Sequence, residues 1–144
     1  GVNDEDRFGC QAVVNEHDEV EALSERLLMG ATTLPLERIV DEIHRHGGLA
    51  VAAHVDRESF GILGQLGFIP EGLPLDAVEV TRRTGIAGAR RAHPEFARFA
   101  LIESSDAHFI ADIGRGITRA LLKEPTLPEL KMAFERKDGR RILE

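Results

Sequence analysis

Three short apolar runs, separated by segments with a helical spacing of apolar residues, constrain the fold of this chain more than any other feature. The runs cover residues 49–53, 77–80 and 99–102. Short uninterrupted apolar runs are typical of parallel strands that are buried on both faces. Helical patterns cover the intervening residues 60–66 and 86–98. This alternation predicts an α/β fold with a mainly parallel sheet.

Further elements are expected on both sides of this region. They are a helix from Pro35 to Gly47, strands at 117–122 and 140–143 (the latter an edge strand), and a helix from Thr126 to Phe134. Thr126 and Glu129 have the spacing of a capping box at the start of that last helix. The chain has 144 residues, whereas a complete (β/α)₈ barrel takes about 250, so it can supply only part of one.

The net charge of −7 belongs to one end of the chain. The first 25 residues hold eight acidic side chains against Arg7 alone, and the remainder holds 17 acidic and 17 basic ones. We therefore expect one α/β domain over 1–144, made of an acidic entry segment at 1–34 and motif-bearing βα units at 35–144. The acidic balance argues against non-specific binding to nucleic acid or to an anionic membrane.

Cysteine content and hydropathy indicate a cytoplasmic protein. Cys10 is the single cysteine, so no intrachain disulfide can form, and a reducing compartment is expected. The longest apolar runs are far too short to cross a bilayer.

Polar residues with metal-binding chemistry follow two of the expected strands. Asp106 and His108 come shortly after run 99–102, and in an extended segment both project to the same side. His54 directly follows run 49–53, and ligands gather at the carboxyl ends of parallel strands. The three side chains form a nitrogen and oxygen ligand set suited to Zn, Mn or Fe. The competing interpretations are a polar turn after the second strand and a histidine that only caps the first.

These residues resemble the PHP (polymerase and histidinol phosphatase) superfamily. The resemblance rests on the segment 47–54, which ends in His54, and on Ser105-Asp106-Ala107-His108 about fifty residues later. It covers the chain from about Pro35 onward. It implies the C-terminal part of a distorted (β/α)₇ barrel with a site of two or three metals that hydrolyses phosphoesters, in which His54, Asp106 and His108 are metal ligands.

The chain departs from that family in its first half. The family's N-terminal His-x-His motif, the Asp-His motif that follows and the glutamate ligand are absent, so about six ligands are missing. The His44-Arg45-His46 triplet has a similar spacing but lies at a helix end, where interaction with the helix C-terminus is expected. We therefore expect an incomplete divalent-metal site, with weak metal binding and weak or no hydrolysis by this chain alone.

Several arginines are candidates for phosphate recognition, because a guanidinium presents a planar fork to phosphate oxygens. Arg57 can bind substrate phosphate or pair with the neighbouring acids Asp56 and Glu58, and Arg115 is a second substrate-binding candidate. A solvated helix face is the favoured interpretation of a basic cluster, which comprises Arg82, Arg83, Arg90, Arg91 and Arg98.

The predicted function is hydrolysis of a small-molecule phosphoester by metal-activated water, with no catalytic residue assigned. The alternative is a non-catalytic α/β module that assembles with a missing N-terminal half or with another subunit, since unpaired strand edges bind partners. A mononuclear iron oxygenase built on His54, Asp106 and His108 ranks third, because the alternation of strands and helices is against it.

Overall fold

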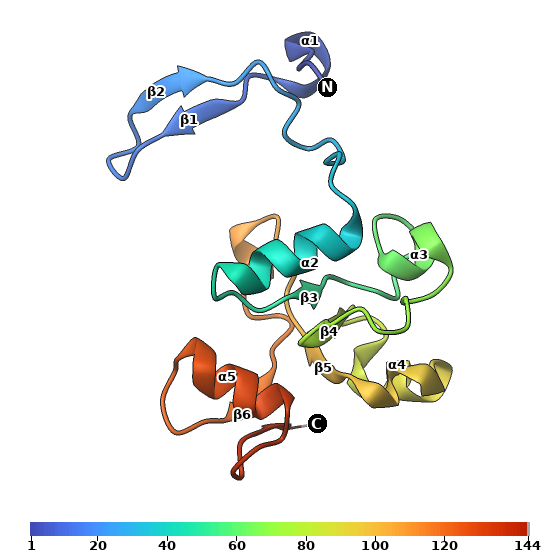
Figure 1. The fold of residues 1–144 in the computed structure, drawn as a ribbon. Helices are drawn as coiled ribbons and strands as arrows, with labels where there is room; N and C mark the ends of the chain where they lie inside the picture. Colours follow the sequence, from blue (N-terminus) through green and yellow to red (C-terminus); the bar gives the residue numbers. More distant parts are fainter. Residues whose placement is uncertain (144) are drawn as a thin grey trace. The chain divides into compact units, whose positions relative to one another are not determined.

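The computed structural model describes residues 1–143 and divides the chain into two compact units, one up to Leu34 and one from Pro35 onward (Figure 1). The first unit contains the short helix α1 (Glu5–Phe8) and an antiparallel hairpin of β1 (Ala12–Val14) and β2 (Val20–Leu23). No residue of this unit is buried. Backbone hydrogen bonds hold it together, and it has no apolar core of its own.

The second unit is built on a three-stranded parallel sheet in the order β3-β4-β5. The strands are β3 (Val51–Ala52), β4 (Ala77–Val80) and β5 (Ala100–Glu103). Each lies within or beside one of the three apolar runs, so the predicted α/β class with a parallel sheet is confirmed. The first strand is shorter than its run, because the chain turns away directly after Ala52.

Helices connect the strands of this sheet. They are α2 (Leu36–Arg45) before β3, α3 (Ile62–Leu66) between β3 and β4, and α4 (Gly85–Ala92) with a 3₁₀ helix (Pro94–Arg98) between β4 and β5. The single helix predicted over 86–98 is thus wrong. His93 has φ −132° and ψ 80°, since a residue before proline is forced out of the helical region. No helix in residues 1–143 has both the length and the apolar character needed to span a bilayer.

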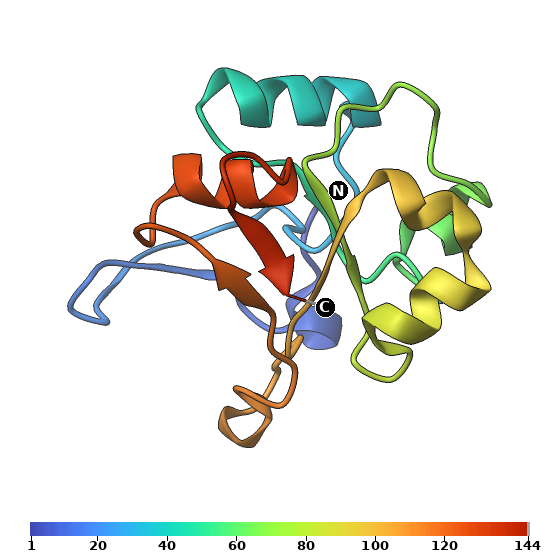
Figure 2. The same ribbon diagram turned by 90° about the horizontal axis from the view of Figure 1, so that it is seen from below.

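The C-terminal elements form their own small sheet. The strands β6 (Arg119–Leu121) and β7 (Arg141–Leu143) pair antiparallel with each other, and α5 (Leu127–Phe134) lies between them in the chain. The expected edge strand at 140–143 therefore exists but does not extend the parallel sheet. In Figure 2 the segment that joins β5 to β6, coloured orange, extends away from the sheet.

The predicted capping box at α5 is wrong. The side chain of Thr126 makes no capping hydrogen bond. Glu129 instead accepts hydrogen bonds from the Lys123 amide at 2.8 Å and from the Arg140 guanidinium at 2.8 and 2.9 Å. The hydrogen bonds from Arg140 and then from Lys123 lower the pKa of Glu129. Glu129 thus binds Arg140, eleven residues away in sequence, instead of capping the first turn of α5.

The core lies between the sheet and its helices. Val78 and Val80 of β4 and Leu101 of β5 are fully buried against Ala89 of α4 and Phe96 of the 3₁₀ helix. This packing fixes α4 against β4 and β5. It therefore also fixes where the chain emerges at the carboxyl ends of these strands.

A buried carboxylate joins the elements at the opposite, amino ends of the strands. Asp76 directly precedes β4 and accepts hydrogen bonds from His44 of α2, the Ala50 amide and Lys131 of α5 at 2.6–2.7 Å. Burial opposes ionisation of Asp76, but these hydrogen bonds outweigh it and lower the pKa of Asp76 below its ordinary value. His44 thus anchors helix α2 at the end of the sheet that lies away from the expected site.

Candidate functional site

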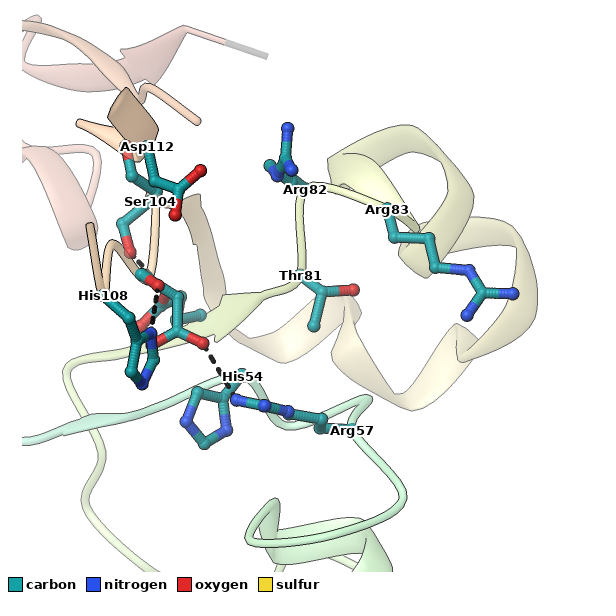
Figure 3. Close-up of a pocket in the computed structure, with 11 residues that line it drawn as sticks. His54, Arg57, Thr81, Arg82, Arg83, Ser104, His108 and Asp112 are labelled. Atoms are coloured by element: carbon teal, nitrogen blue, oxygen red, sulfur yellow. Dashed lines mark hydrogen bonds and ion pairs between the residues drawn. The ribbon is translucent and has the colours of Figure 1, made fainter. Parts of the chain in front are cut away.

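A cavity of about 320 Å³ lies at the carboxyl ends of all three parallel strands. His54 follows β3, Arg82 and Arg83 follow β4, and Asp106 and His108 follow β5. Its complete lining is His54, Arg57, Glu79, Thr81, Arg82, Arg83, Ser104, Ser105, Asp106, His108 and Asp112. The structure therefore brings together the three predicted metal ligands and Arg57 (Figure 3).

His54 lies in a tight turn that leaves one of its ring nitrogens without a partner. The residue has φ +31°, and its carbonyl accepts the Arg57 amide at 2.9 Å. The next amide, that of Val55, bonds to the Glu79 carbonyl at 2.8 Å and so ties the turn to β4. The buried Nδ1 of His54 has no hydrogen-bond partner among the described residues. A buried polar atom without a partner is costly and in native proteins commonly marks a missing ligand or water.

Asp106 pairs with Arg57 across the cavity. The Arg57 Nη1 donates to Asp106 Oδ2 at 2.9 Å, and both side chains are about two-fifths exposed, at 42% and 43%. The alternative expectation, an ion pair between Arg57 and its sequence neighbours Asp56 or Glu58, is wrong. The partner of Arg57 lies 49 residues further along the chain. A pair this exposed is worth about 0–1 kcal/mol, so a ligand can separate it at little cost.

The ring of His108 is oriented by its own backbone. Its Nδ1 lies 2.8 Å from the carbonyl oxygen of Asp106, which can only accept, so Nδ1 carries the proton. The lone pair of a neutral ring then resides on Nε2. Histidines that ligate metals usually have their second nitrogen held in this way, so the orientation of His108 is compatible with that role.

The two serines hold the segment after β5 in place. Ser104 donates to Glu79, and Ser105 donates to the Gly116 carbonyl while accepting the Gly114 amide at 2.9 Å. The acceptors of the two serine hydroxyls are thus Glu79 and Gly116 rather than the neighbouring Asp106. Glu79 itself lines the cavity and accepts the Ser104 hydroxyl, and the two serines stabilise the turn that carries Asp106.

Of the three arginines that line the cavity, the sequence predicted only Arg57 as a substrate-binding residue. Arg115 is not among the lining residues; it pairs with Asp112, which is, at 3.0 Å. Arg82 and Arg83, which were assigned to a solvated helix face, line the cavity. Their position directly after β4 is the same strand-end signal that identified His54, and it could have found them.

Asp56 and Thr81 join the turn after β3 to the turn after β4. Asp56 accepts the Thr81 amide at 2.7 Å and the Thr81 hydroxyl at 2.6 Å. Burial opposes ionisation of Asp56, but the hydrogen bonds from Thr81 and Thr84 prevail and lower its pKa. The carboxylate therefore stays ionised at neutral pH and ties the turn after β3 to the turn after β4.

The donor chemistry suits a divalent cation, although the side chains do not converge on one point. Within residues 1–143, no three His, Cys, Asp or Glu side chains are grouped closely enough to hold an ion. The cavity nevertheless presents two imidazoles and a carboxylate, the ligand types that Zn, Mn and Fe accept. Of these, Asp106 accepts the Arg57 guanidinium at Oδ2, so Oδ1 is the oxygen that it can offer to an ion.

Comparisons of the chain with protein-family models, with curated proteins and with solved structures find no match. The functional argument therefore rests on the cavity itself. Its two salient properties are the ligand-type side chains His54, Asp106 and His108 and the three arginines Arg57, Arg82 and Arg83.

Proposed function

We propose that the cavity is the phosphate-ester site of a metal-dependent phosphoesterase of the PHP type, and that residues 35–144 are the C-terminal part of its distorted (β/α)₇ barrel. One observation carries this proposal: His54, Asp106 and His108 line the same cavity as three arginines. Ligand-type and phosphate-binding side chains from separate strand ends share one small space. Hydrolysis of phosphate esters uses both kinds of group.

Each side chain has a role that its environment supports. His54, Asp106 and His108 would hold a divalent ion (Zn, Mn or Fe), which when bound supplies an activated water and neutralises phosphoryl oxygens. The Asp106 carbonyl keeps the His108 ring in the tautomer that ligates through Nε2.

The arginines bind the substrate. Arg82 and Arg83 are exposed at the cavity, and their guanidinium groups suit bidentate contact with a phosphoryl group. A volume of about 320 Å³ lies at the lower end of the range for small-molecule sites, which favours a small phosphoester over a polymer. The excess negative charge lies within residues 1–25, so it does not repel phosphate from this cavity.

Metal content after loading with Mn²⁺ or Zn²⁺ tests the proposal. We expect wild type to bind the ion and Asp106→Ala to lose about tenfold or more of its affinity, because the only carboxylate of the ligand set is removed. Asp41→Ala, an exposed carboxylate on α2, is the matched control and should behave as wild type. Equal metal binding by Asp106→Ala and Asp41→Ala would refute the site.

A non-catalytic module that assembles with a partner is the second candidate function. It is favoured by the apolar side chains of Phe109, Ile110 and Ile113 beside the cavity, which are 74%, 90% and 71% exposed. Apolar side chains gathered on a surface in this way are typical of interaction sites. Light scattering during size-exclusion chromatography distinguishes the two: assembly of wild type that Ile110→Ser abolishes supports the module, and a monomer at every concentration counts against it.

A further inference from the structure

A second cavity, of about 600 Å³, adjoins the candidate site between the turns that follow β3 and β4. Arg57, Thr81 and Arg83 line both cavities (Figure 3). The remaining lining residues of the second cavity are Asp56, Glu58, Ser59 and Thr84. A molecule that places a phosphoryl group beside the arginines of the first cavity can therefore extend into the second.

The lining of this second cavity is entirely polar. It consists of three hydroxyl groups, two carboxylates and two guanidinium groups, and no apolar or aromatic side chain of the described part of the chain contributes to it. Sites for aromatic or alkyl groups are lined mainly by apolar and aromatic side chains. The two carboxylates balance the two guanidinium groups, so the cavity offers no excess positive charge for a second phosphoryl group. Its chemistry instead suits an uncharged group that is rich in hydroxyls.

Side chains with unused hydrogen-bonding capacity face such a group. Within residues 1–143, the side chains of Glu58 and Ser59 have no hydrogen-bond or ion-pair partner. Arg57 donates one N–H to Asp106 and keeps its other N–H groups. A carboxylate only accepts hydrogen bonds, a guanidinium only donates them, and a hydroxyl does both. Neighbouring hydroxyls of a polyol, which donate and accept, can therefore pair with all three kinds of side chain.

The two turns that carry these side chains are held in place before any ligand binds. Asp56 accepts the amide and the hydroxyl of Thr81 and so joins the turns. The backbone of Gly64 packs closely on the turn after β3, because a Cβ at this position would overlap the Glu58 carbonyl. The backbone that carries Glu58 and Ser59 is therefore fixed, which lowers the entropic cost of binding.

We propose that the substrate of this site is a phosphorylated polyol or sugar. Its phosphoryl group binds beside Arg57, Arg82 and Arg83 in the first cavity, and its hydroxyl-bearing part lies in the second. The inference rests on the proposed function and adds the class of alcohol to which the phosphate is esterified. Glu58 and Ser59 are specificity-determining residues, because they contact the alcohol and not the reacting phosphorus.

Two phosphate monoesters of equal carbon-chain length test the proposal, namely sorbitol 6-phosphate and hexyl phosphate. They carry the same charged group and differ in the hydroxyls of the chain. We expect wild type to bind sorbitol 6-phosphate about five- to tenfold more tightly in isothermal titration calorimetry, which is the effect of about one net hydrogen bond. Equal affinities, or a preference for hexyl phosphate, would overturn the inference.

Variants of the second cavity locate the source of the preference. Glu58→Ala and Ser59→Ala should each reduce the ratio of the two affinities about twofold or more. Glu71→Ala, which removes an exposed glutamate outside both cavities, is the matched control and should keep the wild-type ratio. The ratio is the informative quantity, because loss of a negative charge at Glu58 changes the binding of both monoesters alike. A wild-type ratio in both Glu58→Ala and Ser59→Ala would refute the assignment of the second cavity.

Binding of inorganic phosphate separates failure of the inference from failure of the proposed function. Wild type that binds inorganic phosphate but does not prefer sorbitol 6-phosphate overturns the inference alone. Wild type that binds neither inorganic phosphate nor either monoester overturns the phosphate-ester site and the inference together.

Discussion

Asp76→Ala should be among the most destabilising single substitutions in the parallel-sheet unit. The Asp76 side chain is only 6% exposed and accepts hydrogen bonds from His44 of α2, Lys131 of α5 and the Ala50 amide just before β3. Of its partners, His44 and Lys131 are 31% and 46% exposed and regain water when the carboxylate is lost. The Ala50 amide belongs to a buried residue and is left without its acceptor.

The magnitude follows from these three partners. Leaving the buried amide unsatisfied costs about 1–3 kcal/mol. The hydrogen bond with His44 and the ion pair with Lys131 add less than the ~3–5 kcal/mol of a fully buried pair, since both partners are partly exposed and can hydrate. A total of about 2–4 kcal/mol is a large part of the ~5–15 kcal/mol that stabilises a domain.

Urea unfolding measures this loss. With a slope of about 2 kcal/mol per molar urea, the midpoint should fall by roughly 1–2 M relative to wild type. Asp41→Ala is the control and should change the free energy of unfolding by no more than about 0.5 kcal/mol. A midpoint for Asp76→Ala that coincides with that of Asp41→Ala would refute the reasoning.

The pH dependence of the same difference is an internal check. The pKa of Asp76 is lowered on folding, so its contribution is present above the unfolded pKa of about 4 and is lost as the pH falls through the lower folded pKa. The hydrogen bond to Asp76 raises the pKa of Lys131, so that contribution is present below about 10.4 and is lost as the pH rises further. The stability difference between wild type and Asp76→Ala should therefore be flat near neutrality and shrink at both extremes.

Two further predictions concern the cavity. Asp56→Ala leaves the Thr81 amide and hydroxyl without their acceptor, so we expect the free energy of unfolding to fall by about 1–3 kcal/mol in a thermal melt. We also expect weaker binding of inorganic phosphate. An unchanged phosphate affinity would count against a role of the Asp56–Thr81 linkage in shaping the cavity. Gly116→Ala would place a methyl group against the Ser104 carbonyl and displace the turn that carries the proposed ligands Asp106 and His108, so we expect both the Mn²⁺ affinity and the Tm to fall. Gly88→Ala, a helical position with its nearest atom at 3.4 Å, is the control and should be neutral or stabilising. A neutral Gly116→Ala would contradict the close approach.

Much of the fold could be predicted from the sequence because its signals are local. The apolar runs identified β3, β4 and β5, and Pro35 and Gly47 marked the limits of α2. The prediction failed where a local pattern competed with a longer-range or more specific interaction. Pro94 ends α4 within a segment whose apolar spacing predicted one continuous helix. Glu129 binds Arg140 instead of forming the expected capping box with Thr126.

The cavity shows the same division. Strand-end position was enough to predict that His54, Asp106 and His108 share one cavity, and applying it to β4 would have added Arg82 and Arg83. The pairing of side chains within the cavity could not be predicted. Arg57 had acidic neighbours in sequence, yet its partner is Asp106, which the parallel order of β3, β4 and β5 brings near.

The stabilising carboxylate of Asp76 and the candidate site lie at opposite ends of the parallel sheet. We therefore expect the effects of variants at the two ends to be independent. Asp76 precedes β4 and Thr81 follows it, so these two residues at opposite ends of the strand are separated by about 16 Å of extended chain. Effects at sites this far apart with no shared partner normally add. Asp76→Ala combined with Arg57→Met should therefore unfold at the urea midpoint of Asp76→Ala, corrected for the small effect of Arg57→Met, and retain the Mn²⁺ affinity of Arg57→Met. A large departure from additivity would mean that β4 transmits strain between its ends, and metal affinity in the cavity would then depend on the anchoring of α2 and α5.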